Sequence, residues 1–164
     1  MNTYLLYKFV HIVAVIVFLG NIFTGLFWMH RANKTKSLSI INHAFKGLII
    51  SDRYFTIPGV IIIVTGGIVA AVQGHFPLLR TGWIFWSIIL FTISGIVFAW
   101  KVAPLQKKIY QMTLVKQDDE LNFDWNTYHR FYKAWERWGL LALITPLLAL
   151  VMMVLKWPTA GLLS

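Results

Sequence analysis

Four long stretches without Asp, Glu, Lys or Arg constrain this chain more than any other feature. They cover residues 9–29, 54–79, 81–100 and 138–155. About 20 apolar residues in an α-helix cross the hydrocarbon layer of a bilayer. Gln73, Gly74 and Pro77 are expected to end the second helix at about residue 73. The sequence therefore predicts an all-α membrane four-helix bundle with antiparallel up-and-down topology. It is expected to be a single integral membrane domain over residues 1–164, with spans at about 9–29, 54–73, 82–103 and 136–155.

The composition supports a membrane protein. Of the 164 residues 58% are hydrophobic and 13% are charged, about half the charged share of an average soluble domain. The net charge of +9 is explained by Lys and Arg at helix ends on one side of the membrane, so no nucleic-acid partner is expected. The absence of Cys excludes disulfides, thiolate metal sites and Cys nucleophiles. The first apolar stretch lacks a small-residue cleavage site, so we expect a retained helix and not a signal peptide.

Lys and Arg are shared unevenly between the two sides of the predicted bundle. Twelve lie in the segments 31–53 and 101–137, and only Lys8, Arg80 and Lys156 lie on the other side. Because basic loops are retained in the cytoplasm, both termini are expected outside, in a bacterial cytoplasmic (inner) membrane. Besides the lipid bilayer, a homodimer or a larger membrane complex is an expected partner, since four helices bury little surface on their own.

The first long loop carries a helical pattern of apolar residues. Positions 38, 41, 45, 48 and 49 are apolar and recur at offsets of three and four. This pattern predicts an amphipathic cytoplasmic helix between helices one and two, lying on the membrane surface or packed under the bundle. Asp52 is expected to cap the helix that follows and to meet the positive end of its dipole.

The second long loop is also expected to be largely helical. Helix three continues beyond Pro104 in a rough helical spacing, and the acidic segment 117–120 is the expected loop tip. From Asp124 onward aromatic residues recur at offsets of three and four, which predicts a helix that runs into the fourth span. Aromatic belts at this depth are typical of membrane interfaces.

His11 is the one ionisable side chain inside the first apolar stretch. An ionisable residue inside a membrane span is a functional hypothesis by default. On a helix it shares a face with Ala14, Phe18, Asn21 and Gly25. Two interpretations stay open. The imidazole is either the axial, metal-binding ligand of a b-type haem, or it is hydrogen-bonded to a carbonyl of a neighbouring helix.

A haem held by His11 would have a second axial ligand at the same depth, or an open position. The candidate ligands are His75 in the turn between helices two and three, and Met152 and Met153 near the end of helix four. Gly20 and Gly25 are the cofactor-binding glycines expected to make room for the macrocycle. No zinc, phosphate-loop or Ser-His-Asp motif is present in the sequence.

Two charged pairs form a second group of candidate residues. Asp52 and Arg53 precede the second span, and Glu136 and Arg137 precede the fourth. An ion pair between these helices would offset the cost of placing charges near lipid. The alternative interpretation is a proton or anion entry point on the cytoplasmic side.

Several short motifs together resemble a known family. They are the early His of helix one, Gly20, the basic loop, DRYFTIPG at 52–59, TGG at 65–67 and GW at 82–83. With these motifs the chain resembles, over nearly its whole length, a family of small bacterial predicted integral membrane proteins of unknown function. The resemblance implies four membrane helices.

A more distant similarity bears on chemistry. The order of elements is similar to that of the HemJ-type membrane protoporphyrinogen oxidases and of the membrane domain of copper-resistance protein D. HemJ-type proteins carry an early His in helix one that binds haem, and His11 matches that position. FYKAWERW at 131–138 resembles their entry into helix four, with Glu136 in the place of an Asn-Glu pair. Their Lys after a Trp at the start of helix three has no counterpart after Trp83, a departure that concerns the oxidase activity and not the haem.

Three functions are compatible with these observations. The first is a haem b protein in electron transfer or porphyrin-linked redox, which as an enzyme would be a haem-dependent membrane oxidoreductase. The second is a non-enzymatic membrane scaffold, assembly factor or complex subunit. The third is a copper or small-solute permease with soft ligands. Its ligands would be Met29, His30, Met152 and Met153.

Overall fold

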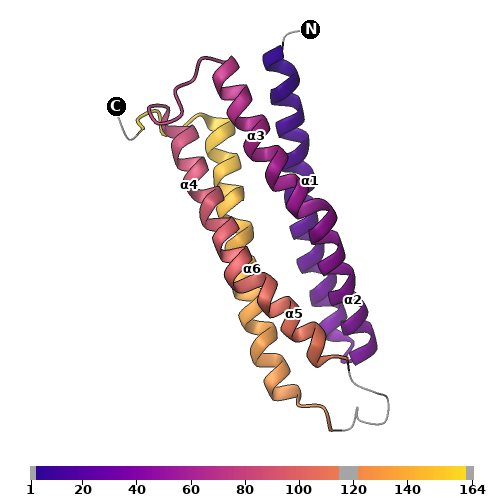
Figure 1. The fold of residues 1–164 in the computed structure, drawn as a ribbon. Helices are drawn as coiled ribbons and strands as arrows, with labels where there is room; N and C mark the ends of the chain where they lie inside the picture. The colour runs from indigo at the N-terminus through magenta and orange to yellow at the C-terminus, as the bar shows by residue number, and fades with distance from the viewer. Residues whose placement is uncertain (1–2, 115–121, 162–164) are drawn as a thin grey trace.

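The computed structural model describes residues 3–114 and 122–161 and shows an all-α bundle, which confirms the predicted fold class (Figure 1). The expected loop tip at 117–120 lies outside the described residues. Both termini lie at one end of the bundle, here called the terminal end, and the opposite end is called the loop end (Figure 1). The helical elements are α1 (Thr3–Lys34), α2 (Leu38–Ser51), η1 (Asp52–Thr56), α3 (Ile57–Gln73), α4 (Gly82–Val97), η2 (Phe98–Val102), α5 (Ala103–Met112) and α6 (Trp125–Leu155).

These elements join into four long continuous helices. The short element η1 connects α2 to α3 without a break, and η2 connects α4 to α5 in the same way. The four helices contain 31 to 36 residues each, and all are long and apolar enough to cross a membrane. A 36-residue helix is about 54 Å long, whereas the hydrocarbon layer is roughly 30 Å thick. The helices therefore extend well beyond the predicted spans and beyond a bilayer.

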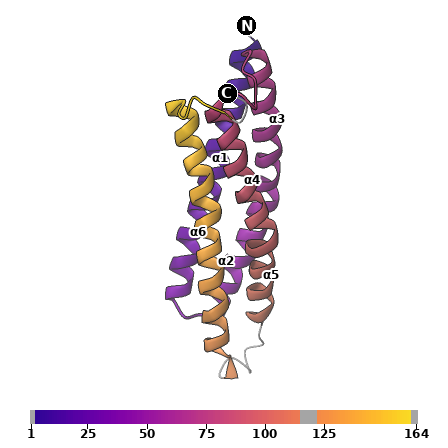
Figure 2. The same cartoon turned by 90° about the vertical axis from the view of Figure 1, so that its left-hand side faces the viewer.

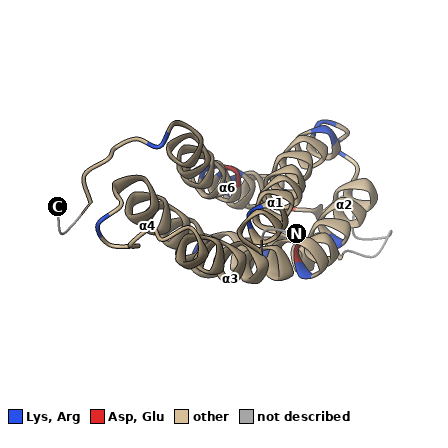
Figure 3. Cartoon of the chain, turned by 90° about the horizontal axis from the view of Figure 1, so that it is seen from above, with Lys and Arg blue, Asp and Glu red and all other residues tan. Residues whose placement is uncertain are grey.

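Exposed side chains divide the bundle into two parts along its axis. Large exposed apolar side chains are dense within residues 5–28, 54–72, 79–100 and 138–157, and we call this part the belt. The part formed by residues 29–51 and 101–137, the head, exposes only Ile40, Ile50 and Leu114 of this kind among its described residues. Figure 3, a view from the terminal end, shows how sparse the charged positions are along the helices. The belt is the part suited to lipid, and the head projects at the loop end.

The helices pack mainly as two pairs, which come together in the head. α1 runs along α3, and α4 runs along α6 (Figure 2). The buried core of the head is formed by Met29, Ile41, Phe45, Leu48, Val102, Ile109, Tyr128, Tyr132, Trp135 and Ala142. A smaller core in the belt joins Phe18 and Ile63 of the first pair to Leu143 of the second. Phe91 of α4 also packs against this core, with its ring centroid 5.5 Å from that of Phe18.

The two connecting elements are π-helical turns, and each ends two residues before a proline. Pro58 and Pro104 have no N–H, and a proline ring crowds the carbonyl four residues earlier. The π turns shift the hydrogen bonding by one residue, so that the Ile57 N–H donates to the Asp52 carbonyl and the Ala103 N–H to the Phe98 carbonyl. The helices continue through both prolines for this reason. Such turns are frequent at functional sites.

A third proline, Pro146, lies inside α6 and leaves the Ala142 carbonyl without its usual donor four residues on. The side chain of Ser94 in α4 supplies the missing hydrogen bond, because its Oγ donates to that carbonyl at 2.7 Å. Ser94 is buried in the contact between α4 and α6. A serine of one helix thus compensates a proline of its partner.

The amphipathic helix expected after helix one is present as α2, but it is not a separate element on the membrane surface. Its apolar stripe packs into the head against α1 and α5, and α2 continues directly into α3. The helix is capped at its start by Ser37, whose side chain accepts a hydrogen bond from the Ile40 N–H. The prediction that Asp52 caps the second span is therefore wrong, because Asp52 lies inside a continuous helix.

The other local predictions around the loops agree with the structure. α3 ends at Gln73, α5 continues beyond Pro104, and α6 begins directly after Asp124. Asp124 caps α6, because its side chain accepts a hydrogen bond from the Thr127 N–H at 3.0 Å. Both long loops therefore consist largely of extensions of the membrane helices.

Candidate functional site

His11 lies on the face of α1 that packs against α3. Its Nδ1 lies 2.8 Å from the carbonyl oxygen of Ile63. A carbonyl only accepts hydrogen bonds, so Nδ1 carries the proton and Nε2 keeps a free lone pair. A Cβ added to Gly67 would lie 3.0 Å from Cε1 of the imidazole, so a glycine is needed to seat the ring. The hydrogen bond to a neighbouring helix was one of the two interpretations of His11. It is compatible with the other, since metal-binding histidines ordinarily donate their second N–H to a carbonyl.

The two candidate methionines lie close to the depth of His11. α1 and α6 are in contact in the belt, where a Cβ added to Gly139 would lie 3.3 Å from Leu26 Cδ2. The distance from Leu26 to His11 is about 22 Å along α1. The same number of residues counted along α6 from Gly139 reaches the turn that contains Met152 and Met153. Both side chains are half-buried.

His75 lies at a different depth. Gly67 contacts the His11 ring, and the rest of α3 from Gly67 to Gln73 rises about 9 Å toward the terminal end. His75 follows beyond that end of α3, with an exposed side chain and a backbone φ of 57°. The structure does not bring His75 to the level of His11.

The two glycines expected beside a cofactor lie away from His11. A Cβ on Gly25 would meet Leu48 Cδ1 at 2.6 Å, so Gly25 makes room for α2 in the head. Gly20 has open space in front of it. The glycines that contact His11 are Gly66 and Gly67 of α3.

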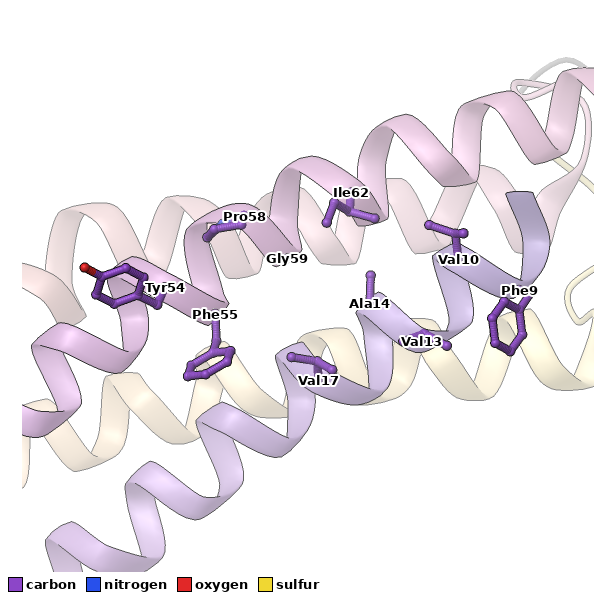
Figure 4. A pocket seen from close by; sticks show the side chains of 10 residues that line it. All are labelled: Phe9, Val10, Val13, Ala14, Val17, Tyr54, Phe55, Pro58, Gly59 and Ile62. Carbon is purple, nitrogen blue, oxygen red and sulfur yellow. The ribbon is translucent and has the colours of Figure 1, made fainter. Parts of the chain in front are cut away.

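A shallow groove follows the contact of α1 and α3 in the belt. It encloses about 260 Å³ and is lined almost entirely by apolar side chains, among them Val10, Ala14, Phe55 and Ile62 (Figure 4). His11 is not among its lining residues. Most of its lining side chains are exposed, so the groove opens at the outer surface of the helix pair and does not include the imidazole.

Asp52 lies at the centre of a buried polar cluster at the junction of belt and head. Its Oδ1 accepts hydrogen bonds from Thr56 Oγ1 at 2.7 Å and from Asn21 Nδ2 at 3.2 Å. Its Oδ2 accepts one from Gln106 Nε2 at 3.0 Å. Asn21 Nδ2 also lies 3.0 Å from Thr56 Oγ1. The cluster joins α1, η1 and α5. Asp52, Thr56 and Gln106 are almost completely inaccessible to solvent.

The ion pair expected between helices two and four is not formed among the described residues. Asp52 is held by neutral side chains, and Arg53 and Arg137 are exposed. Glu136 instead lies 3.9 Å from Nδ1 of His30 in α1, and both side chains are about half exposed. The physical reason is the π turn, which directs Asp52 and Thr56 into the bundle while Arg53 stays outside.

The soft ligands considered for a permease do not converge on one site. Met29 is buried in the core of the head, and His30 pairs with Glu136. Met152 and Met153 lie near the terminal end of α6. The described residues contain no group of three or more His, Cys, Asp or Glu side chains that could hold a metal ion.

A family model matches residues 5–157 under the description "Predicted integral membrane protein (DUF2269)". The chain belongs to this family. The match covers nearly the whole chain and confirms the expected membrane family. No curated protein and no solved structure matches the DUF2269 protein. It is an integral membrane protein with four helices suited to spanning a bilayer.

Sequence reasoning missed two members of the polar cluster of this DUF2269 protein. Thr56 looks like an ordinary polar residue near the start of a span, and Gln106 like one of a polar loop. A signal was present, because Gln106 lies between Val102 and Ile109 at offsets of four and three. Those neighbours are core residues, so Gln106 occupies a core position of the helix.

Proposed function

We propose that this DUF2269 protein binds haem b through Nε2 of His11 and acts in electron transfer or porphyrin-linked redox chemistry. The observation that carries the proposal is the 2.8 Å hydrogen bond between Nδ1 and the Ile63 carbonyl. It fixes the ring and the tautomer that leaves Nε2 as an electron-pair donor. The donor chemistry of this residue therefore fits a haem. The resemblance of the His11 position to the early helix-one His of HemJ-type proteins points in the same direction.

The residues around His11 would each contribute to such a site. The Ile63 carbonyl orients the imidazole and raises its basicity. Gly66 and Gly67 allow the ring to lie against α3. A thioether ligand from Met152 or Met153 would come from α6 of the other helix pair, and a His/Met ligand pair favours a high reduction potential. When bound, haem supplies one-electron redox chemistry.

The proposal is tested by visible absorption spectra of the detergent-purified protein, oxidised and then reduced with dithionite. Cells are supplied with a haem precursor, and His11→Ala and His75→Ala are purified in parallel. We expect a Soret band that sharpens on reduction in the wild-type protein and in His75→Ala, and that is absent in His11→Ala. A featureless wild-type spectrum, or a band that survives His11→Ala, refutes the assignment. A complex subunit or a permease would then be the leading functional candidate.

The proposed location is a bacterial cytoplasmic membrane with both termini outside and the head in the cytoplasm. The support is the excess of Lys and Arg in the segments that form the head. The chain has no Cys, so single cysteines report topology without background. With a membrane-impermeant maleimide on intact spheroplasts, Thr159→Cys is expected to label and Asn126→Cys to stay unlabelled until the membrane is opened. The reverse pattern refutes this orientation.

A further inference from the structure

The Asp52 cluster contains a carboxylate whose charge has no partner among the described residues. Every hydrogen bond to it comes from a neutral group, namely a hydroxyl and two amides. Both carboxylate oxygens lie within hydrogen-bond distance of a neutral donor, so both can accept when Asp52 is ionised. Only 7% of Asp52 is exposed. A buried carboxylate of this kind is costly unless a cation compensates it.

The charged groups on the surrounding elements do not supply that cation. α1 carries no charged residue within 9–29, and Glu136 of α6 pairs with His30. The basic side chains of η1, α2, η2 and α5 nearest to the cluster in sequence are all exposed. They are Arg53, Lys46, Lys101, Lys107 and Lys108. No described ion pair involves Asp52.

The same side chains can surround a cation with oxygen atoms. A 180° rotation of the terminal amide of Asn21 or Gln106 exchanges its NH₂ for its carbonyl oxygen. The cluster then offers both carboxylate oxygens, two amide oxygens and Thr56 Oγ1. Neighbouring ligands of an ion with oxygen distances of about 2.4 Å lie about 3.4 Å apart at right angles. The present separations of 2.7–3.2 Å between these polar groups therefore widen by about 0.2–0.7 Å when the ion enters.

The charge and the ligand type select the kind of cation. Five oxygens with no nitrogen or sulfur suit a hard cation. A single carboxylate balances one positive charge, and no second acidic side chain is within the cluster. A divalent or a transition-metal ion is therefore disfavoured.

We propose that Asp52, Thr56, Asn21 and Gln106 form a binding site for one sodium ion. The site is separate from His11, which lies ten residues toward the terminal end from Asn21 on α1. Because its ligands come from α1, η1 and α5, the ion fastens three helices at the junction of belt and head. Protons compete with sodium, since protonation of Asp52 removes the charge that holds the ion.

The test measures thermal unfolding in micelles of a non-ionic detergent as NaCl replaces choline chloride at constant ionic strength and pH 7.5. KCl is run as a second monovalent salt. Asp52→Asn removes the charge with little change of shape, and Glu136→Gln is the matched control that neutralises the other described carboxylate within the bundle helices. We expect a saturable, sodium-specific increase of the unfolding midpoint in the wild-type protein and in Glu136→Gln, and none in Asp52→Asn. Lowering the pH should weaken the apparent sodium affinity. Where Asp52 is largely protonated, the affinity should fall by nearly tenfold for each pH unit.

Other outcomes overturn the proposal. Equal effects of sodium, potassium and choline would show that no sodium site exists. A midpoint that depends on pH through Asp52 but not on sodium would show that the cluster holds a proton only. If Asp52→Asn does not fold, Thr56→Val removes one oxygen ligand from an isosteric side chain. It should weaken sodium binding about tenfold, measured by ²³Na line broadening on the detergent-solubilised protein, and unchanged binding contradicts the site.

Discussion

Replacing Ser94 by alanine tests how the bundle accommodates Pro146. The Ser94 hydroxyl is the donor to the Ala142 carbonyl, at 2.7 Å, and Pro146 removes the donor that α6 itself would provide. A buried acceptor left without a partner costs about 1–3 kcal/mol. Side-chain hydrogen bonds in membrane bundles average about 0.6 and reach about 1.7 kcal/mol. Since Pro146 withholds the N–H that α6 would ordinarily donate to this carbonyl, we expect Ser94→Ala to destabilise by about 1.5 kcal/mol, which is roughly a tenfold change in the unfolding equilibrium.

Ser87 provides a matched control on the same helix. Its Oγ donates to the Ala149 carbonyl at 3.1 Å, but that carbonyl also has the N–H four residues on in α6. Ser87→Ala is therefore expected to cost only about 0.5 kcal/mol. The assay is reversible unfolding of the purified protein by SDS in mixed micelles, followed by tryptophan fluorescence and circular dichroism.

The double variant Ser94→Ala, Pro146→Ala measures the coupling between Ser94 and Pro146. Alanine restores an N–H to the Ala142 carbonyl, so Ser94→Ala should become nearly neutral in that background. We expect a coupling energy of about 1 kcal/mol between the two positions. Equal costs of Ser94→Ala with and without the proline, or a cost no larger than that of Ser87→Ala, would refute the reasoning.

Three further outcomes follow from contacts described above. Gly67→Ala places a Cβ 3.0 Å from Cε1 of His11 and should lower the free energy of unfolding by about 1 kcal/mol in the SDS assay. An unchanged unfolding midpoint would contradict the close packing of the imidazole against Gly67. Tyr128→Phe removes the 2.8 Å hydrogen bond from the phenol to α1 and should cost about 1 kcal/mol in the same assay; a neutral effect would show that water replaces the bond. Hydrogen bonds from Thr127 hold the pKa of Asp124 below its usual range, so this cap stabilises α6 above pH of about 4 and is lost as the pH falls through the lowered pKa. Circular dichroism between pH 6 and 2 should show an acid-induced loss of helix that Asp124→Ala abolishes, and identical acid titrations of both proteins would contradict this role.

The membrane helices could be predicted because their signal is local. The stretch 9–29 contains no Asp, Glu, Lys or Arg. This property can be read from the sequence without knowing which residues the helix contacts. The apolar stripe of α2 was visible for the same reason. Its place in the head was not, because that depends on α1 and α5 presenting a complementary surface.

The polar cluster could not be predicted because it depends on the backbone through Pro58. A proline after Asp52 ordinarily indicates the first turn of a helix, which makes Asp52 look like a cap. Because of the π turn, the helix continues through the proline, and Asp52 lies inside the bundle, where it contacts Gln106. The pairing of Glu136 with His30 was likewise invisible, since it requires the relative depth of α1 and α6.

The division into belt and head means that two parts of one chain are stabilised in two different solvents. In the head, the large buried side chains of Phe45, Tyr128 and Trp135 are withdrawn from water, so the hydrophobic effect acts on them as in a soluble domain. In the belt that driving force between helices is missing, because lipid tails are as apolar as the side chains. Urea should therefore open the head first, while SDS should separate the helix pairs of the belt. Such a molecule would have no single intrinsic stability, only one for each medium that surrounds it.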